Sequence, residues 1–563
     1  MTTFPSTAAS HPERTSGRRA PGQRSPGQRS PGRQASPRQA SPRAPAKLPV
    51  ELAVAADRHA ELPLTEQIAA QLRDVLTSGR LTAGERLPST RALATALGVS
   101  RTVVTAAYTQ LFAEGWLEGR HGSGTYVAAG AVVPPGAGSG PASLVPGPGS
   151  GPASLAPALP PARTLPPAAA LQPLRPALPL PPVPAGTTTW PAGPRAAWLQ
   201  PDPAPPVNLW PGIPWQAGID QAAWRRAWRH AGTEPVAAQP DPRGRAALRA
   251  ALTGYLRRSR GVWAPADQIL VTRGVSAGLG LIGTALLRPG DRVGVEEPGY
   301  QAARAVFAAR GAQLVPCRVD GDGLVVDELP GDLRLVYTTP AHQYPLGGRL
   351  PVPRRQALAA WARSTGALIV EDDYDGEFRY DVAPLPTLFG LDPDVVIYLG
   401  TTSKTLTPTL GAGWLVARPD LIPALTVAAV DLGERVSGPV QSAVTELLAS
   451  GELERHVRRM RHEYARRRAV MVTTLGGRLS GDTAGLHMVL ELPPGTAAAV
   501  AAAARERGVE VSTLERYFGG PPTLEGLILG YGAADVAAVS RGCQVIAEIL
   551  AGLADLPGTL APR

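Results

Sequence analysis

The sequence predicts a multidomain protein with one small, mainly helical domain and one large α/β domain. In the first domain, apolar residues recur at helical spacing, and in the second, short β-branched runs alternate with helical segments. Two low-complexity stretches separate these domains from the amino terminus and from each other. At 563 residues, the chain is long enough for both domains to bury a core.

The two low-complexity segments differ in composition. Residues 1–49 contain the near-repeat APGQRSPGQRSPGRQASPRQASPR. Residues 1–50 carry a net charge of +8, whereas the whole chain carries +10. This composition predicts a disordered basic tail that either adds salt-sensitive affinity for phosphates or serves as a solubilising extension. Residues 129–206 form a Pro/Ala/Gly-rich linker, which is typical of a semi-rigid spacer. The predicted folded domains are therefore residues 50–128 and 207–556.

The composition also limits the compartment and the chemistry. Cys317 and Cys543 are the only cysteines, and neither they nor the eight histidines show metal-ligand spacing. We therefore expect neither a disulfide framework nor a metal site. The chain does not begin with a charged region and an apolar core, and it has no apolar run long enough to span a bilayer. These features predict a cytoplasmic protein without a membrane partner.

Three helices are expected between residues 62 and 115. Apolar residues recur once per turn in the first helix, which Gly79 ends. Ser89 is placed to cap a second helix that ends at Gly98, and Ser100 is placed to cap a third. Two short helices joined by a turn that contains Gly form a helix-turn-helix.

The segment WLEGRHGSGTYV follows the third helix and predicts a strand, a glycine-rich tip and a second strand, which together form a wing. From about residue 64 to the end of this wing, and including RLPSTR, the sequence closely resembles the GntR-type winged helix-turn-helix domain, over about 65 residues. The resemblance implies that the domain binds a double-stranded DNA operator through the start of the third helix and the wing. The residues that it implicates are Ser89, Thr90, Arg91, Ser100, Arg101, Thr102, Tyr108, Arg120, Gly122, Ser123, Gly124 and Thr125.

Strands and helices alternate in the large domain. The runs QILVT, RVGVEE, RLVYTTP, ALIVEDD and VVIYLG are apolar and rich in β-branched residues. This pattern predicts a parallel or mostly parallel sheet that is buried on both faces, with a ligand at the carboxyl ends of its strands. Polar residues follow those ends, at 273–276, 296–300, 342–343, 371–374 and 401–404.

A dinucleotide site is one interpretation of the glycines that follow the first of these strands. Gly278, Gly280 and Gly283 spell GxGxxG, and a pair of glutamates ends the next strand at about the distance of a ribose-binding acid. The tight turn of such a site belongs at the end of the strand, however, whereas these glycines fall within a predicted helix. The interpretation also leaves Lys404 unexplained.

Lys404 is one of only two lysines, whereas 54 of the 56 basic residues are arginines. The other lysine, Lys47, lies in the basic tail. A GC-rich genome favours Arg wherever charge alone is needed, so a retained Lys indicates chemistry that a guanidinium cannot perform, above all imine formation with an aldehyde. A leftover surface lysine is the alternative interpretation.

A pyridoxal phosphate (PLP) site needs several groups besides this lysine. They are a carboxylate at the pyridine nitrogen, a phenol at the ring oxygen, a stacked aromatic ring and a phosphate cup at a helix amino terminus. SKTLTP, EDDYDGEF, EEPGY and TRGVSAG supply the set in an order and spacing that resemble the fold-type I aminotransferase domain. The two domains together resemble the MocR subfamily of GntR regulators.

This resemblance implies a role for each residue. Lys404 would bind PLP covalently, and Asp372 would pair with the pyridine nitrogen. Tyr374 would contact the ring hydroxyl, and Tyr300 would stack on the ring. The residues that would line the phosphate are Gly274, Val275, Ser276, Thr401 and Ser403. Arg516, in TLERYF, lies where the family often has an arginine for an effector carboxylate, although an ordinary surface arginine fits the same pattern.

One departure from the family pattern concerns the phosphate. The pattern SKTLxPxLRxGY contains an arginine that grips the phosphate, and Gly411 stands in its place. Losing a charge-assisted pair costs about 1.5 to 3 kcal/mol, or about one to two decades of affinity. Either a neighbouring arginine such as Arg273 compensates, or free PLP is itself the sensed signal.

The two domains together predict a transcriptional regulator. Its second domain would sense PLP, or a small amine or amino-acid effector, through an aldimine at Lys404. Aminotransferase folds build their sites at a dimer interface, so the resemblance also implies a homodimer, often head to tail. Two alternatives stay open: a working PLP-dependent aminotransferase with an appended DNA-binding domain, and a DNA-binding scaffold whose second domain is empty.

Overall fold

The computed structural model describes residues 54–58, 60, 62–78, 80–120, 124–128, 207–235, 239–381 and 385–554. The predicted basic tail and the Pro/Ala/Gly-rich linker lie outside these ranges. Within the ranges, no helix combines the length and the apolar character that a membrane span needs.

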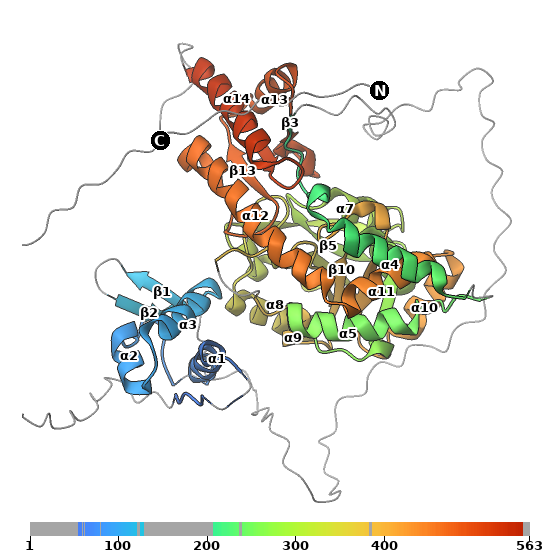
Figure 1. The fold of residues 1–563 in the computed structure, drawn as a ribbon, viewed down its shortest axis with the longest axis horizontal. Coiled ribbons are helices and arrows are strands. Elements are labelled where there is room, and N and C mark those ends of the chain that lie inside the picture. Colours follow the sequence, from blue (N-terminus) through green and yellow to red (C-terminus); the bar gives the residue numbers. More distant parts are fainter. Residues whose placement is uncertain are drawn as a thin grey trace, which may run out of the picture. The chain divides into compact units, whose positions relative to one another are not determined.

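The described part of the amino-terminal domain contains α1 (Leu64–Thr77), α2 (Thr90–Leu97) and α3 (Arg101–Ala113), followed by a two-stranded hairpin (Figure 1). Ser89 caps α2 by accepting a hydrogen bond from Ala92 N, and Ser100 caps α3 by accepting one from Val103 N. Gly98 ends α2 in the left-handed conformation. The predicted helix-turn-helix is therefore confirmed.

The hairpin that follows is the predicted wing. It consists of β1 (Leu117–Arg120) and β2 (Gly124–Val127), which pair antiparallel. Trp116, just before β1, is 1% exposed and packs into the core that the helices form. The tip of the wing, at residues 121–123, lies outside the described residues.

A mixed sheet forms the centre of the large domain. Its described strands, in spatial order, are β4 (Ile269–Thr272), β11 (Gly413–Val416), β10 (Val396–Thr401), β9 (Leu368–Asp372), β8 (Leu335–Thr338), β5 (Arg292–Glu297) and β6 (Gln313–Asp320), with β7 (Gly323–Leu324) at the edge. Except at β11 and at β7, neighbouring strands run parallel. Every residue of β4, β8, β9, β10 and β11 is buried. The predicted mostly parallel sheet, covered on both faces, is confirmed.

Helices cover both faces of this sheet (Figure 1). One face is covered by α6 (Val275–Leu286), α7 (Gln301–Ala308) and α10 (Ile422–Asp431). The other face is covered by α5 (Ala246–Arg260), α8 (Val352–Thr365), α9 (Leu388–Leu391) and α11 (Gly438–Ala449), with α4 (Gln221–Thr233) packed on α11. The hydrophobic core therefore lies in two layers, one on each side of the strands.

The glycines of the GxGxxG pattern lie inside α6 and are buried. A Cβ on Gly278 would lie 2.8 Å from Leu399 Cδ2, and one on Gly283 would lie 3.0 Å from Arg310 Cγ. These glycines let α6 pack closely on the sheet and on its neighbouring segment, which is a structural role. The dinucleotide interpretation was therefore wrong.

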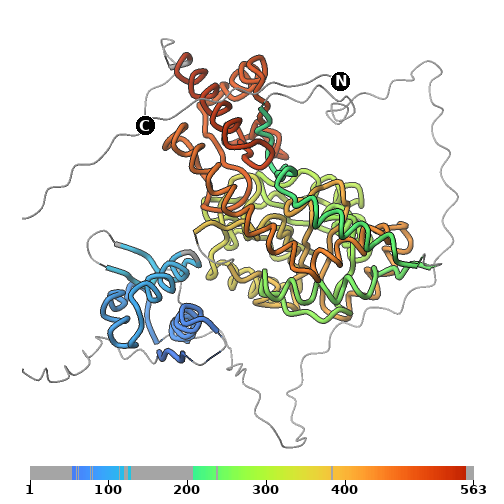
Figure 2. The backbone as a smooth tube through the Cα atoms, in the orientation of Figure 1, coloured from blue at the N-terminus to red at the C-terminus, as the bar shows by residue number. Residues whose placement is uncertain are grey.

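The carboxyl-terminal part adds a second, smaller sheet. Its described elements are α12 (Glu452–Leu475), β12 (Leu479–Ser480), β13 (His487–Glu491), α13 (Ala497–Glu506), β14 (Val509–Glu510), β15 (Ser512–Thr513), β16 (Gly526–Gly530) and α14 (Val536–Ala554). The strands of the sheet are ordered β12-β13-β16-β15. The first strand of the domain, β3 (Val207–Asn208), pairs in parallel with β14, so the beginning of the domain lies beside its end (Figure 2).

Candidate cofactor and DNA-binding sites

Lys404 follows the carboxyl end of β10. Its Nζ donates a hydrogen bond of 2.6 Å to the carbonyl oxygen of Gly212, 192 residues earlier in the chain. Gly212 has a φ of 75°, and a Cβ there would lie 2.8 Å from Nζ, so a glycine permits this close approach. Burial lowers the pKa of Lys404, with Asp375 and Asp372 acting in the opposite direction. A lowered pKa favours the neutral amine, which is the nucleophilic form.

Two of the three consecutive acids near the end of β9 are fully engaged. Glu371 accepts hydrogen bonds of 2.9 Å from two backbone amides at the start of α9. Asp373 accepts two hydrogen bonds from Arg260, at 2.5 and 3.0 Å, and one of 2.8 Å from Tyr398. Both carboxylates therefore hold the fold together and offer no free oxygen to a ligand.

Asp372, between them, keeps one oxygen free. Its Oδ2 accepts a hydrogen bond of 2.6 Å from the Tyr337 hydroxyl, whereas Oδ1 has no partner in the described part of the chain. The residue is 3% exposed, and burial raises its pKa to about 7. A buried oxygen without a donor is costly, and a protonated pyridine nitrogen supplies both the donor and the opposite charge. The geometry of Asp372 thus fits the predicted cofactor.

The predicted phosphate-binding residues come together at the amino terminus of α6. Gly274 precedes the helix with a φ of 102°, and Val275 and Ser276 begin it. A Cβ on Gly274 would lie 3.8 Å from Thr401 Oγ1, which in turn bonds to the backbone N and the Oγ of Ser403. Helix amino-terminal amides and hydroxyl groups are suitable ligands for a phosphate. We call these five residues the phosphate cup.

The missing arginine is not replaced by Arg273. Its guanidinium is bound in a bidentate manner by Glu434, at 2.5 and 2.6 Å, and its side chain is 55% exposed. Gly411 has a φ of 53°, and a Cβ there would meet no described atom within 4 Å. The hypothesis that Arg273 compensates was therefore wrong, because Glu434 already holds the guanidinium.

Two tyrosines that the sequence predicted as cofactor ligands lie near this cup. The Tyr300 hydroxyl bonds to Ser276, and its ring meets Tyr344 edge-on at 6.1 Å. The Tyr374 hydroxyl lies 2.9 Å from His342 Nδ1, and burial raises its pKa well above the ordinary value, so it keeps its proton. Tyr344 also packs edge-on against Tyr374, which joins the two predicted residues in one aromatic cluster.

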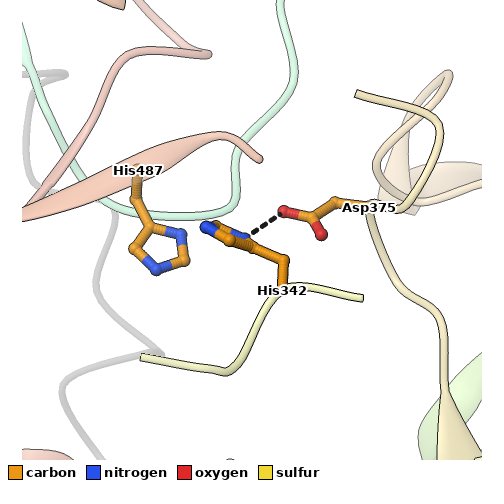
Figure 3. Close-up of side chains that lie close together, drawn as sticks. All are labelled: His342, Asp375 and His487. Carbon is orange, nitrogen blue, oxygen red and sulfur yellow. Dashed lines mark hydrogen bonds and ion pairs between the residues drawn. The ribbon is translucent and has the colours of Figure 1, made fainter. Parts of the chain in front are cut away.

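His342, Asp375 and His487 form a buried cluster that the sequence spacing did not predict (Figure 3). One donor atom from each lies within 4.8 Å of the others, and each residue is 1% exposed. The expectation that the histidines form no cluster was therefore wrong. In Figure 3, however, His342 lies between the other two, and its Nδ1 is bonded to Asp375. A hydrogen-bonded chain explains this arrangement better than a tetrahedral metal centre.

Arg516 lies in a short 3-10 helix, Leu514–Tyr517, and its side chain is exposed. Its guanidinium lies over the ring of Trp210, 5.1 Å from the centroid, which is a cation–π contact. Trp210 precedes Gly212, so Arg516 borders the segment that contacts Lys404. Its role toward an effector stays a prediction.

Most of the predicted DNA-contacting residues lie at the starts of α2 and α3. Those that are exposed are Ser89, Arg91, Ser100, Arg101 and Thr102, and Thr90 is half-buried. Arg101 Nε donates a hydrogen bond of 3.3 Å to Thr90 Oγ1, which links the two helix starts. Tyr108 differs from these residues because it is 2% exposed and its hydroxyl donates a hydrogen bond of 2.8 Å to the Pro88 carbonyl. Its predicted contact with DNA was wrong, since this side chain instead holds the segment that enters α2.

The wing contributes fewer described residues. Arg120 and Gly124 pair across the hairpin, and Thr125 follows, whereas Gly122 and Ser123 lie outside the described residues. Sequence reasoning missed Arg86, whose exposed side chain lies so close to the wing that a Cβ on Gly124 would be 2.9 Å from Arg86 Nε. Arg86 therefore adds a basic group beside the start of β2. Its place in the RLPSTR segment was the only signal of this role in the sequence.

Comparison with known proteins agrees with this division into two sites. Residues 64–127 match the family of bacterial regulatory proteins named gntR, and residues 214–521 match aminotransferase class I and II. The "HTH-type pyridoxine biosynthesis transcriptional regulator PdxR" of Corynebacterium glutamicum is 35% identical over 86% of this chain and 95% of its own length. The chain belongs to the MocR/PdxR type of GntR-family transcriptional regulators. A second such regulator, the "Probable rhizopine catabolism regulatory protein MocR" of Rhizobium meliloti, is 33% identical over 90% of this chain and 99% of its own length.

Solved aminotransferases share the large domain of this MocR/PdxR-type regulator. LysN, the alpha-aminoadipate aminotransferase of Thermus thermophilus, was solved with N-(5'-phosphopyridoxyl)-L-leucine and is 26% identical, with a TM-score of 0.58. The alignment covers 64% of this chain and 95% of LysN. An archaeal alanine:glyoxylate aminotransferase is 25% identical, with a TM-score of 0.60 over 64% of this chain and 94% of its own. The large domain is thus a fold-type I aminotransferase domain, a type that typically binds PLP.

Proposed function

We propose that this regulator holds PLP covalently at Lys404 and that occupancy of this site by PLP controls its binding to an operator. The free oxygen of buried Asp372 carries this proposal, because it is a prepared partner for a cationic N–H group. When bound, PLP supplies an aldehyde for imine formation with an amine. Lys404 would provide that amine, Asp372 would hold the ring nitrogen protonated, and the phosphate cup would bind the anionic end.

The phosphate cup contains no arginine, and this composition supports PLP itself as the signal. With Gly411 in place of an arginine and Arg273 bound to Glu434, only amides and hydroxyl groups remain among the predicted phosphate ligands. The loss of one charge-assisted pair lowers affinity by about one to two decades, so occupancy would follow the cellular concentration of PLP. The name of the Corynebacterium relative, a pyridoxine biosynthesis regulator, favours the same signal.

A homodimer is the second part of the proposal. Val427, Val430 and Leu432 are 59%, 48% and 43% exposed on α10 and directly after it. Glu434, two residues further on, pairs with Arg273 beside the phosphate cup, so this apolar surface adjoins the site. A second copy would cover the surface and present two winged helices to a two-part operator.

A binding experiment with DNA tests the proposal. Operator fragments are first selected from genomic DNA with the full chain, and their affinity is then measured with and without PLP. We expect the wild type to change its affinity with PLP and Lys404→Arg to bind DNA without responding. Lys47→Arg is the matched control and should respond like the wild type. A response that persists in Lys404→Arg contradicts the proposal.

Amino-acid transamination is the alternative function, because the lysine, acid and phenol that it needs are all in place. Incubation of the pure protein with amino donors and keto-acid acceptors separates the two functions. If the protein performs multiple turnovers and its DNA affinity does not change with PLP or amines, transamination is the better-supported function.

A further inference from the structure

One ring nitrogen of His342 has two partners with opposite requirements. Nδ1 lies 2.9 Å from the Tyr374 hydroxyl and 3.0 Å from Asp375 Oδ2. A carboxylate only accepts hydrogen bonds, so Asp375 is satisfied only when Nδ1 carries a proton, whereas Tyr374 can donate only to a bare Nδ1. One nitrogen cannot satisfy both partners at once. Whether the Tyr374 hydroxyl donates to His342 therefore depends on whether Nδ1 or Nε2 of His342 carries the proton.

The other nitrogen of His342 faces His487 (Figure 3). His487 Nε2 lies 2.9 Å from the carbonyl oxygen of Pro345, so it carries the proton and leaves Nδ1 of the neutral ring bare. Burial, reinforced by His342, lowers the pKa of His487 well below its ordinary value, which keeps this ring neutral. In the described part of the chain, His342 Nε2 and His487 Nδ1 have no partner, and the ring centroids are 4.8 Å apart.

We propose that His342 is a positioning residue that releases the Tyr374 hydroxyl to the ring oxygen of PLP by taking up a proton. In the cofactor-free protein, Tyr374 donates to His342 Nδ1, so the neutral ring carries its proton on Nε2. When Tyr374 turns its hydroxyl to the ring oxygen of bound PLP, Nδ1 is left bare beside Asp375 and takes up one proton from solvent. His342 is then an imidazolium that donates to Asp375. This inference rests on the proposed function, since it requires PLP beside Tyr374.

The charges around His342 favour this proton. Asp375 is in direct contact with Nδ1, and both side chains are excluded from water, so their attraction is strong. Two arginines line the small cavity that borders His342 and Asp375, but each is already paired. These pairs are Arg260 with Asp373 and Arg379 with Asp482. Lys404 is a further nearby cation, and its charge acts on His487.

Counting protons during PLP binding tests the inference. Calorimetric titration of the full chain with PLP, in two buffers of different ionisation enthalpy, gives the number of protons taken up. We expect the wild type to take up one proton more than His342→Gln. Asp375→Asn should likewise take up one proton fewer than the wild type. His230→Gln, which replaces an exposed histidine on α4, is the matched control and should behave like the wild type. Equal proton uptake in the wild type and His342→Gln overturns the inference.

A second measurement needs only the wild-type fold. In the full chain with ¹⁵N-labelled imidazoles, NMR distinguishes neutral tautomers from imidazolium for the eight histidines. We expect the His342 signal, identified by its loss in His342→Gln, to change from the neutral Nε2–H form to imidazolium when PLP is added. A His342 ring that stays neutral after PLP has bound Lys404 overturns this inference but leaves the proposed function intact. If borohydride reduction attaches no PLP to Lys404, the proposed function fails instead.

Discussion

Asp372 shows how burial prepares a single residue for a ligand. Its free Oδ1 and its raised pKa have one origin, the exclusion of water from the end of β9. An acid with a raised pKa holds its proton more tightly in the folded protein than in the unfolded chain. As the pH rises from about 4 to about 7, the unfolded chain loses this proton first, so the free energy of unfolding falls across this range.

Replacing Asp372 tests this pH dependence. In the cofactor-free protein, we expect Asp372→Asn to lose less stability than the wild type between pH 5 and pH 8, by at least about 1 kcal/mol, because a neutral amide does not ionise. Part of the slope should remain, since burial also raises the pKa values of Glu371 and Glu377 to about 7. Urea unfolding at the two pH values measures the difference. Parallel pH profiles for the two proteins would show that Asp372 does not carry the raised pKa.

Gly411 is the residue at which the cofactor affinity can be raised. We expect Gly411→Arg to tighten PLP binding about tenfold or more, because a guanidinium there restores a charge-assisted pair with the phosphate. Gly411→Ala is the matched control, since it places the same Cβ strain on a backbone with a φ of 53° but adds no charge. Equilibrium titration by absorbance measures both affinities. Equal affinities for the Ala and Arg variants contradict a phosphate role for this position.

At the scale of secondary structure elements, local signals were sufficient wherever the stabilising group is close in sequence. Ser89, Gly98 and Ser100 were predicted as helix caps, and the structure confirms each of them, because a cap bonds to an amide or carbonyl within the first or last turn. The strands β6 and β11 were not singled out. β6 contains Pro316 and has only one fully buried residue, Cys317. β11 is short and begins at a glycine, so neither strand has the apolar β-branched run of a central strand.

The two neighbouring residues at the start of α3 should have separable effects. We expect Ser100→Ala to lower the stability of the DNA-binding domain by about 1 kcal/mol, because Val103 N loses its cap. Arg101→Ala should leave stability nearly unchanged, weaken DNA binding and lower the salt dependence of binding by about one unit of slope. Thermal unfolding and DNA titration at several salt concentrations measure these effects. An Arg101→Ala variant with unchanged DNA affinity rules out the assignment of α3 as the recognition helix.

At the scale of the whole molecule, the cofactor site combines segments from the entire large domain. Residues at or just after the ends of strands, such as Asp372 and Lys404, could be predicted because parallel strands end at one edge of a sheet. Gly212 and His487 could not, since each meets the site only through tertiary packing. The Arg273 hypothesis failed for the same reason, because its partner Glu434 lies 161 residues away.

The basic amino-terminal tail gives a prediction for the full chain. We expect removal of residues 1–49 to lower the slope of log affinity for DNA against log salt by up to about 7, because most of the formal positive charge lies there. A chain that keeps the tail but has its eight arginines replaced by glutamine should lose the same slope. Fluorescence anisotropy with non-specific DNA measures it. An unchanged slope in both chains indicates a tail that only increases solubility.

The covalent attachment of PLP can be located directly, because the chain has only two lysines. PLP is added to the full chain, the adduct is reduced with borohydride, and peptide mass spectrometry identifies the modified residue in the wild type, in Lys404→Arg and in Lys47→Arg. We predict a phosphopyridoxyl group on Lys404 in the wild type and in Lys47→Arg, and no labelled peptide from the large domain in Lys404→Arg. Labelling confined to Lys47 or to the amino terminus, with Lys404 unmodified, would contradict a PLP sensor in this domain.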